Sequence, residues 1–184
     1  MKKLAFFSSL LVVTMFVLGA CSKKDSSPAP GSASATFSMP FDVFGTTGAI
    51  GNSKCTVNLS DVLTSSGNQD KVNYVNGRAI TTDQNSNITF KGIPAGVTLS
   101  NITFSTADNT IKMTLNDIDG KPLVVSGDIT IDTGYDSCFN LLNQISTYLV
   151  SKKNITLNVA FTPNQNVSIT GGITLNLKAT YSWN

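Results

Sequence analysis

Cysteine is the residue type with the most chemical potential in this sequence, which contains three cysteines and no histidine. Histidine is the commonest general base in enzymes and the commonest protein ligand of transition metals. A serine or cysteine hydrolase of the usual kind needs such a base beside its nucleophile. Without histidine to lower a thiol pKa, Cys55 and Cys138 are poor candidates for catalysis. The sequence therefore predicts a protein that is not an enzyme, with no catalytic residue, cofactor or metal.

Cys21 is placed for a different chemistry, the covalent attachment of lipid. Lys2 and Lys3 precede an apolar run, Leu4–Val17, and Leu18-Gly19-Ala20-Cys21 follows. This order of charge, apolar stretch and small residues is typical of an export signal. The quartet resembles the lipobox of bacterial lipoproteins at every position, which implies that the thiol of Cys21 accepts a diacylglycerol and that residues 1–20 are removed. The alternative is an uncleaved membrane helix, but the run is short of the roughly 20 residues that spanning requires.

The segment after the lipid cysteine is predicted to be a flexible tether covering residues 21–36. Ser22-Lys23-Lys24-Asp25 resembles the surface-export signal of Bacteroidota lipoproteins, although it has one acid where those signals often have more. Solvated tether charges are the alternative interpretation. Ser26–Ala35 consists mainly of Ser, Pro, Ala and Gly, which bury too little surface to order themselves. We expect one folded domain at 37–184, held by its lipid at the outer membrane or cell surface.

Cys55 and Cys138 are candidates for a disulfide, because exported proteins fold where disulfides persist. Cys55 shares the apolar face of a predicted strand with Val57 and Leu59. Cys138 lies on the apolar side of a predicted helix, so both thiols are expected to point toward the core. The bridge would close a loop of about 84 residues, worth about 4–5 kcal/mol in the chain-entropy model. Two buried free thiols are the alternative.

Several acids stand close together near predicted turns. Asp117, Asp119 and Gly120 resemble the start of a calcium loop, but the further oxygen ligands and the distant glutamate are missing. The same residues make a good hairpin turn, which is the structure that we predict. Three further acids could gather a cation only if their loops converge: Asp128, Asp132 and Asp136.

Tyr181 and Trp183 stand two positions apart on one predicted strand, so their side chains face the same way. If exposed, they could form a stacking platform for a sugar ring, and they are our candidate ligand-binding residues. Leu175 and Leu177 occupy the same face, which favours packing in or beside the core as the alternative role.

Most of the folded region alternates apolar and polar residues, as half-buried antiparallel strands do. Pro40 cannot donate a ladder hydrogen bond, so its strand is predicted to lie at a sheet edge. Asn76-Gly77 and Asp119-Gly120 are predicted hairpin turns, and a bulge is predicted near Ser100-Asn101. The alternating segments are 37–43, 55–59, 111–115, 155–161 and 173–183.

Two segments have helical rather than alternating spacing. The residues from Ser137 to Val150 predict a helix capped by Asp136 or Ser137, and Leu59–Leu63 predicts a short helical turn capped by Ser60. One main helix among many strands predicts an all-β fold, a mostly antiparallel β-sandwich of immunoglobulin-like or related type with one peripheral helix.

The lipoprotein resemblance and the lack of catalytic groups together predict a lipid-anchored envelope module for interaction or scaffolding. The alternative is a carbohydrate- or glycan-binding surface lipoprotein, and an amphiphile carrier would need an internal apolar cavity. The expected partners are the membrane, through the N-terminal lipid, and a protein or glycan at the cell surface. A nucleic acid is not expected, because charged residues make up 13% of the chain and the net charge is only +2.

Overall fold

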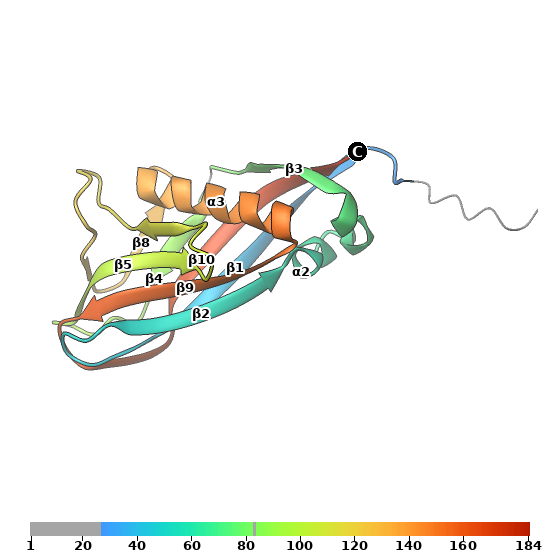
Figure 1. Cartoon of the computed structure of the whole chain (residues 1–184). Coiled ribbons are helices and arrows are strands. Elements are labelled where there is room, and N and C mark those ends of the chain that lie inside the picture. Colours follow the sequence, from blue (N-terminus) through green and yellow to red (C-terminus); the bar gives the residue numbers. More distant parts are fainter. Residues whose placement is uncertain (1–26, 83) are drawn as a thin grey trace, which may run out of the picture.

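The computed structural model describes residues 27–82 and 84–184, and most of these residues form antiparallel strands in two packed sheets (Figure 1). The first sheet has the order β1 (Gly31–Gly45), β10 (Val167–Trp183), β4 (Asn87–Phe90) and β8 (Ile129–Asp132), with β3 (Val75–Ile80) also paired to β10. The second has the order β2 (Gly51–Asn58), β9 (Asn154–Pro163), β5 (Thr98–Thr106) and β6 (Lys112–Thr114), with β7 (Val125–Ser126) on β5. The predicted all-β sandwich is confirmed.

The first and last strands of the fold pair along almost their whole length. β1 runs antiparallel to β10 from Gly31 opposite Trp183 to Gly45 opposite Val167. Within the first sheet β1 pairs only with β10, so the edge position predicted from Pro40 is confirmed. The predicted tether was too long, however, because residues 31–36 are part of this strand.

Small side chains at the start of β1 explain why a segment without apolar bulk is ordered. Ala33 and Ala35 stand opposite Tyr181 and Ala179, so the large side chains on β10 have small neighbours on β1. A Cβ atom on Gly31 would lie 3.0 Å from a ring carbon of Trp183. Residues 31–36 are therefore ordered mainly by their partner strand, and Ala35 is the residue among them that is buried in the core.

The core is the layer of apolar side chains between the two sheets. The inward residues of β9 and β10 that the alternation predicted are buried, among them Leu157 and Phe161 on β9 and Leu175 and Leu177 on β10. The rings of Phe41 and Phe104 meet edge to face with centroids 5.7 Å apart. Because Phe41 belongs to β1 and Phe104 to β5, this aromatic pair joins the two sheets through the centre of the core.

The long helix α3 (Asp136–Lys152) packs against strands of both sheets, β3 and β8 in the first and β6 and β9 in the second. Its buried face consists of Cys138, Leu141, Leu142, Ile145, Ser146 and Leu149. The helix predicted from Ser137 to Val150 is confirmed. Its predicted cap is wrong: Tyr135 is the N-cap, without a side-chain bond, and the Ser137 hydroxyl is bonded to the backbone of Asn116.

The short helical turn is present as α2 (Leu59–Thr64), and a 3-10 helix, η1 (Gln69–Tyr74), follows it. Asn58 and not Ser60 is the N-cap of α2, and its side-chain amide donates to Asp61 at 2.8 Å. The predicted cap at Ser60 is therefore wrong by two positions, because the chain turns as soon as β2 ends.

Most predicted turns are confirmed, with one clear exception. β5 changes register against β9 between Ser100 and Thr103, where the bulge was predicted. Gly120 has a φ of 78° inside the Asp117–Lys121 turn, as expected. Gly77, in contrast, lies inside β3 and pairs with Ser182, so no hairpin forms there. The absence of a Cβ atom at Gly77 leaves room for the Ser182 hydroxyl, which would otherwise have to rotate away.

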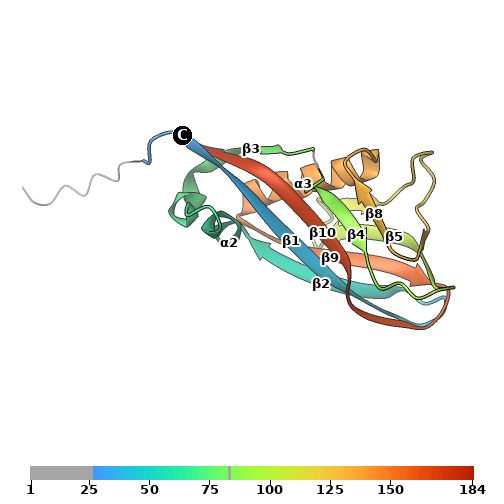
Figure 2. The same cartoon turned by 180° about the vertical axis from the view of Figure 1, so that it is seen from behind.

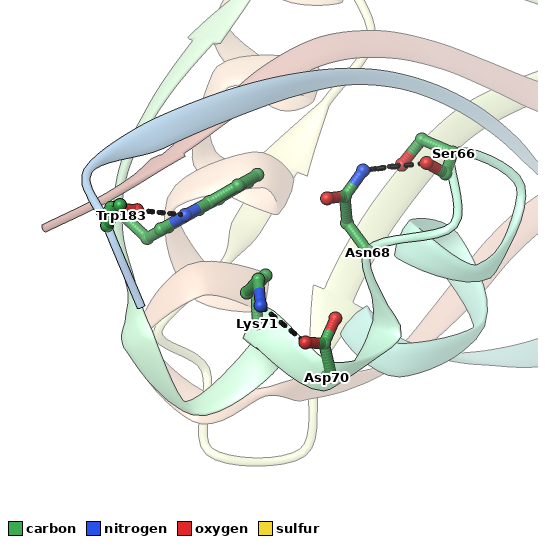
Figure 3. A network of polar contacts seen from close by, with 6 residues as sticks. Ser66, Asn68, Asp70, Lys71 and Trp183 are labelled. Carbon is green, nitrogen blue, oxygen red and sulfur yellow. Dashed lines mark hydrogen bonds and ion pairs between the residues drawn. The ribbon is translucent and has the colours of Figure 1, made fainter. Parts of the chain in front are cut away.

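The two ends of the molecule differ in what they carry (Figures 1 and 2). We call the end with α2, η1 and the first residues of β1 the proximal end; the C-terminus lies there too. Trp183 closes this end, and its indole N–H donates to the carbonyl of Ala29 at 3.1 Å (Figure 3). We call the opposite end, with loops 46–50, 91–97 and 164–166, the distal end. A chain attached through its N-terminus would therefore present the distal end outward.

Two phenylalanines on β1 test how much the aromatic pair contributes to stability. Phe41 is 1% exposed, so Phe41→Ala should lower the free energy of unfolding by about 3–5 kcal/mol, because it leaves a cavity between the sheets. Phe44 is 47% exposed, so the matched change Phe44→Ala should alter it by less than about 0.5 kcal/mol. Urea denaturation of both variants measures this difference, and equal losses would contradict the proposed core.

Candidate functional site

Cys21, the predicted lipid attachment site, lies outside the described residues, and so do the export signal and Lys23 and Lys24. The lipid anchor therefore stays a prediction from the sequence. The described chain begins close to the proximal end, and β1 starts ten positions after Cys21 in the numbering. Ten residues of extended chain reach at most roughly 35 Å.

The predicted disulfide is absent, because both Cys55 and Cys138 are free thiols. Cys55 is partly buried on β2, at one edge of the second sheet. Cys138 is fully buried on α3, with its sulfur 3.5 Å from the carbonyl of Ile131 on β8. β8 ends the first sheet on the side away from β1, which contacts β2. The inward direction of both thiols was predicted correctly, but they lie toward opposite edges of the sandwich.

The predicted sugar platform is also wrong. Tyr181 is fully buried and Trp183 is 5% exposed, so neither ring is available to stack on a ligand. Burial raises the pKa of Tyr181 to about 12, since the phenolate would be poorly solvated there. Packing in the core, the alternative considered for this pair, is the role that the structure gives them.

The acids near turns accept hydrogen bonds from backbone N–H groups, Asp117 and Asp132 within their own turns and Asp128 from the neighbouring loop 91–97. One Asp117 oxygen accepts from the N–H groups of Asp119 and Lys121, at 3.0 and 2.8 Å. One Asp128 oxygen accepts from Gly92 and Ile93, and Asp132 accepts from Gly134. Within residues 27–82 and 84–184, no three acids or cysteines are grouped closely enough to hold a metal ion. The first set is thus the predicted turn, and the loops of Asp128, Asp132 and Asp136 do not converge.

A groove of about 400 Å³ lies between loop 115–122 and the first turn of α3. We call it the α3 groove. Its floor and walls carry few apolar and many polar side chains: Met113, Asn116, Asp117 and Ile118 on one side, and Tyr135, Asp136, Ser137 and Asn140 on the other. In Figures 1 and 2 both walls lie on the half of the molecule away from the proximal end.

The two walls of the groove are tied together at one point. The Ser137 hydroxyl accepts from the N–H of Asn116 at 3.1 Å and donates to the carbonyl of the same residue at 2.9 Å. The 115–122 loop is closed at its base, where Leu123 donates to the carbonyl of Leu115 at 2.9 Å. The Ser137 hydroxyl thus joins the two walls of the groove, and the Leu123–Leu115 bond closes the base of one of them.

Polar groups with no partner in the described chain face this groove. The side chains of Asp136 and Asn140 are exposed and make no hydrogen bond with a described residue, and one Asp117 oxygen is also free. Asp136 and Asn140 lie one helical turn apart, so they present their polar groups on the same side of α3. The α3 groove thus offers two carboxylates and an amide to a ligand, next to apolar surface from Met113 and Ile118.

Titratable groups with a shifted pKa lie outside the groove. Asp108 accepts from the Thr106 hydroxyl at 2.6 Å, and this bond, with others from Thr110 and Tyr148, holds the pKa of its carboxyl far below the ordinary value. Partial burial and the bond to Asp108 raise the pKa of Tyr148. A carboxylate that holds its charge so firmly is a poor proton acceptor near neutral pH. This cluster fastens the β5–β6 connection to α3 and has a structural role.

The distal end is made of loops that are pinned to one another. Asn166 accepts from the N–H of Thr47 at 3.0 Å, and Asn164 accepts from the N–H of Thr98 at 2.7 Å. Two large apolar side chains remain exposed there, Phe44 at 47% and Ile50 at 69%. These residues stand at either side of the β1–β2 connection, and we call them the apolar tip.

Sequence reasoning did not identify the α3 groove. Asp117 was singled out for its turn and Asp136 as a possible helix cap, but nothing in their spacing indicated that they face one cavity. Tyr135 and Asn140 gave no signal of their own. The only available hint was that the predicted turn at Asp117 and the predicted helix start at Asp136 both contained polar side chains with no assigned partner.

The free thiols lead to a labelling prediction. In native protein, iodoacetamide should modify Cys55 slowly and Cys138 hardly at all, because burial, with some contribution from Asp132, raises the pKa of Cys138 to about 12. In denatured protein without reductant, both should alkylate, as peptide mass spectrometry would show. If both stayed unmodified in that denatured sample, a bridge would exist and the structure would be wrong there.

The buried indole leads to a second prediction, since the chain contains a single tryptophan. Trp183 emission should lie at shorter wavelength than that of free tryptophan and should resist quenching by iodide until the protein unfolds. Steady-state fluorescence with increasing iodide measures this. Efficient quenching in the native state would restore Trp183 as a candidate for ligand contact.

Comparison with protein-family models, curated proteins and solved structures returned no match for the chain. No helix among residues 27–82 and 84–184 has the length and apolar character needed to cross a bilayer. The α3 groove and the apolar tip are the two surface features of the described chain on which a function can be based.

Proposed function

We propose that this protein is a lipid-anchored recognition module of the cell envelope, held at the outer membrane or cell surface, and that it is not an enzyme. The observation that carries the proposal is that the two ends of the molecule differ. The chain enters the fold at the proximal end, while the α3 groove and the apolar tip lie on the half away from that end. A module anchored through Cys21 would present both surfaces to the surroundings.

The construction of the domain supports a presenting role. The β1–β10 pair runs from the proximal to the distal end and connects the tether directly to the far loops. Those loops are held by side-chain bonds, such as that of Gln165 to the carbonyl of Gly96 at 2.8 Å. A preorganised surface loses less conformational entropy on binding than a mobile one, which favours recognition.

The arrangement of ionisable groups supports a function without catalysis. Asp117 in the α3 groove is engaged by backbone N–H groups of its own turn, and Asp136 is exposed. The groups with strongly shifted pKa values, Asp108, Cys138 and Tyr181, lie elsewhere and apart. An active site usually has perturbed acids or bases grouped at a cleft, and none of these three residues lines the α3 groove.

A glycan-binding lipoprotein is the second candidate function, and it now depends on a different site. The burial of Tyr181 and Trp183 removes the platform that first suggested it. The α3 groove provides exposed polar side chains beside a partly buried tyrosine, Tyr135, which is the combination that glycan recognition needs.

The anchor is tested by metabolic labelling in the native cell. Palmitate should be incorporated into the wild-type protein and into Cys55→Ser, which serves as the matched control. Cys21→Ser should lose the label and should accumulate as a precursor longer by residues 1–20, because the thiol that accepts the lipid is missing. Labelling of Cys21→Ser at the wild-type level would refute the lipid-anchored function.

A further inference from the structure

We propose that the α3 groove binds a neutral carbohydrate, with the sugar hydroxyls bonded to Asp136, Asn140 and Asp117 and one sugar face packed beside Tyr135. The inference rests on the proposed recognition function and names its ligand class. It starts from a cavity of about 400 Å³, which lies in the size range of small-ligand sites.

The free groups in the groove match what a sugar hydroxyl requires. A hydroxyl donates one hydrogen bond and accepts others, so it pairs with carboxylates and amides alike. Asp136 and the free oxygen of Asp117 can accept, and the amide of Asn140 can do both. Adjacent hydroxyls on a ring can therefore be bonded from both walls of the groove.

The charge of the groove favours a neutral ligand over an anionic one. Asp117 and Asp136 are the charged residues among those that line it, and no lysine or arginine contributes to its surface. A phosphate, a sulfated sugar or a uronic acid would meet like charge without a compensating cation. A neutral sugar, in contrast, gains charge-assisted hydrogen bonds, which are the stronger kind.

Two backbone positions beside the groove, Leu115 and Asn116, are already bonded within the fold. Strand addition needs an edge with free N–H and C=O groups. Ser137 occupies both backbone groups of Asn116, and Leu123 occupies the carbonyl of Leu115. These two positions are closed to an added strand, although β6, which lines part of the groove, lies at the end of its sheet. The recognition that we propose is made by the side chains of the groove.

Apolar surface completes the match. Met113 and Tyr135 are partly buried and pack against the core, so they provide fixed walls. Ile118 is 81% exposed at the rim, where water would leave it when a ligand binds. A sugar ring has an apolar C–H face as well as polar edges, and an amphipathic site of this kind contacts both.

The test uses the full mature protein, purified in detergent, and saturation-transfer-difference NMR. The probes are the neutral disaccharides cellobiose, maltose and N,N′-diacetylchitobiose, with glucuronic acid as an anionic comparison. We expect transfer to at least one neutral probe and none to glucuronic acid. The proposal would be overturned if no neutral probe showed transfer, or if glucuronic acid bound as well as they did.

Variants then place the ligand in the groove. Asn140→Ala and Asp136→Asn should each weaken binding of the responding probe about tenfold, since each removes or weakens a hydrogen bond to the sugar. Gln144→Ala is the matched control for the first, being exposed one turn further along α3, and Asp119→Asn is the control for the second. Unchanged affinity in both groove variants would refute the site.

The outcome can be separated from that of the anchor. A protein that incorporates palmitate through Cys21 but binds no neutral probe would keep the anchored module and lose the carbohydrate ligand. A protein that binds a sugar through Asn140 and Asp136 but incorporates no palmitate would keep the ligand and lose the anchor. Equal melting temperatures of each variant and its control show that the fold is intact.

Discussion

The pairing of β1 with β10 is the interaction on which the rest of the structure depends. It joins the beginning of the chain to its end, and both strands contribute their inward side chains to one core. The match of sizes along this pair, Gly31 and Ala33 against Trp183 and Tyr181, lets two large aromatic residues be buried near the C-terminus. Because β10 also pairs with β3 and β4, the whole first sheet is organised around it.

The helix α3 depends on that core and in turn creates the groove. Its apolar face packs against strands of both sheets, and this packing places its first turn beside β6 and loop 115–122. The Ser137 hydroxyl, which the sequence suggested as a helix cap, bonds Asn116 instead and joins helix to loop. The start of α3 is thereby left with free polar groups, and these line a cavity that neither element forms alone.

Alternation predicted the fold class and the strands β1, β2, β6, β9 and β10, because a strand with one buried face must show it in sequence. The inward sets on β9 and β10 and the helical spacing of α3 were all correct for this reason. Alternation did not predict the short strands β3, β4, β7 and β8. Residues 31–36 were missed because they are ordered by pairing with β10, which is distant in sequence. Their side chains are small, so they show no alternation of large apolar and polar residues. The hairpin turn predicted at Asn76-Gly77 was wrong because a glycine can also allow two strands to approach closely, as Gly77 does opposite Ser182.

The candidate sites were harder to predict than the fold, since sequence gives the direction of a side chain but not its neighbours. The faces of Cys55, Cys138, Tyr181 and Trp183 were correct, yet neither a disulfide nor an exposed platform resulted. The position of Cys138 beside β8 and of Cys55 on β2 depends on strand order, which local spacing does not encode. The same holds for Asp117 and Asp136, which share a groove only after the chain has folded.

The strand pair also determines how the protein would respond to mechanical force. A tether pulls on β1 from the proximal end, while a ligand held in the α3 groove pulls on α3 and loop 115–122, which are joined to β1 through the paired strands of the sandwich. Antiparallel hydrogen bonds lie across the strand direction, so this load shears the whole ladder from Gly31 to Gly45 at once and does not peel it bond by bond. An anchored module with this geometry would resist unfolding while its far half holds a partner under tension.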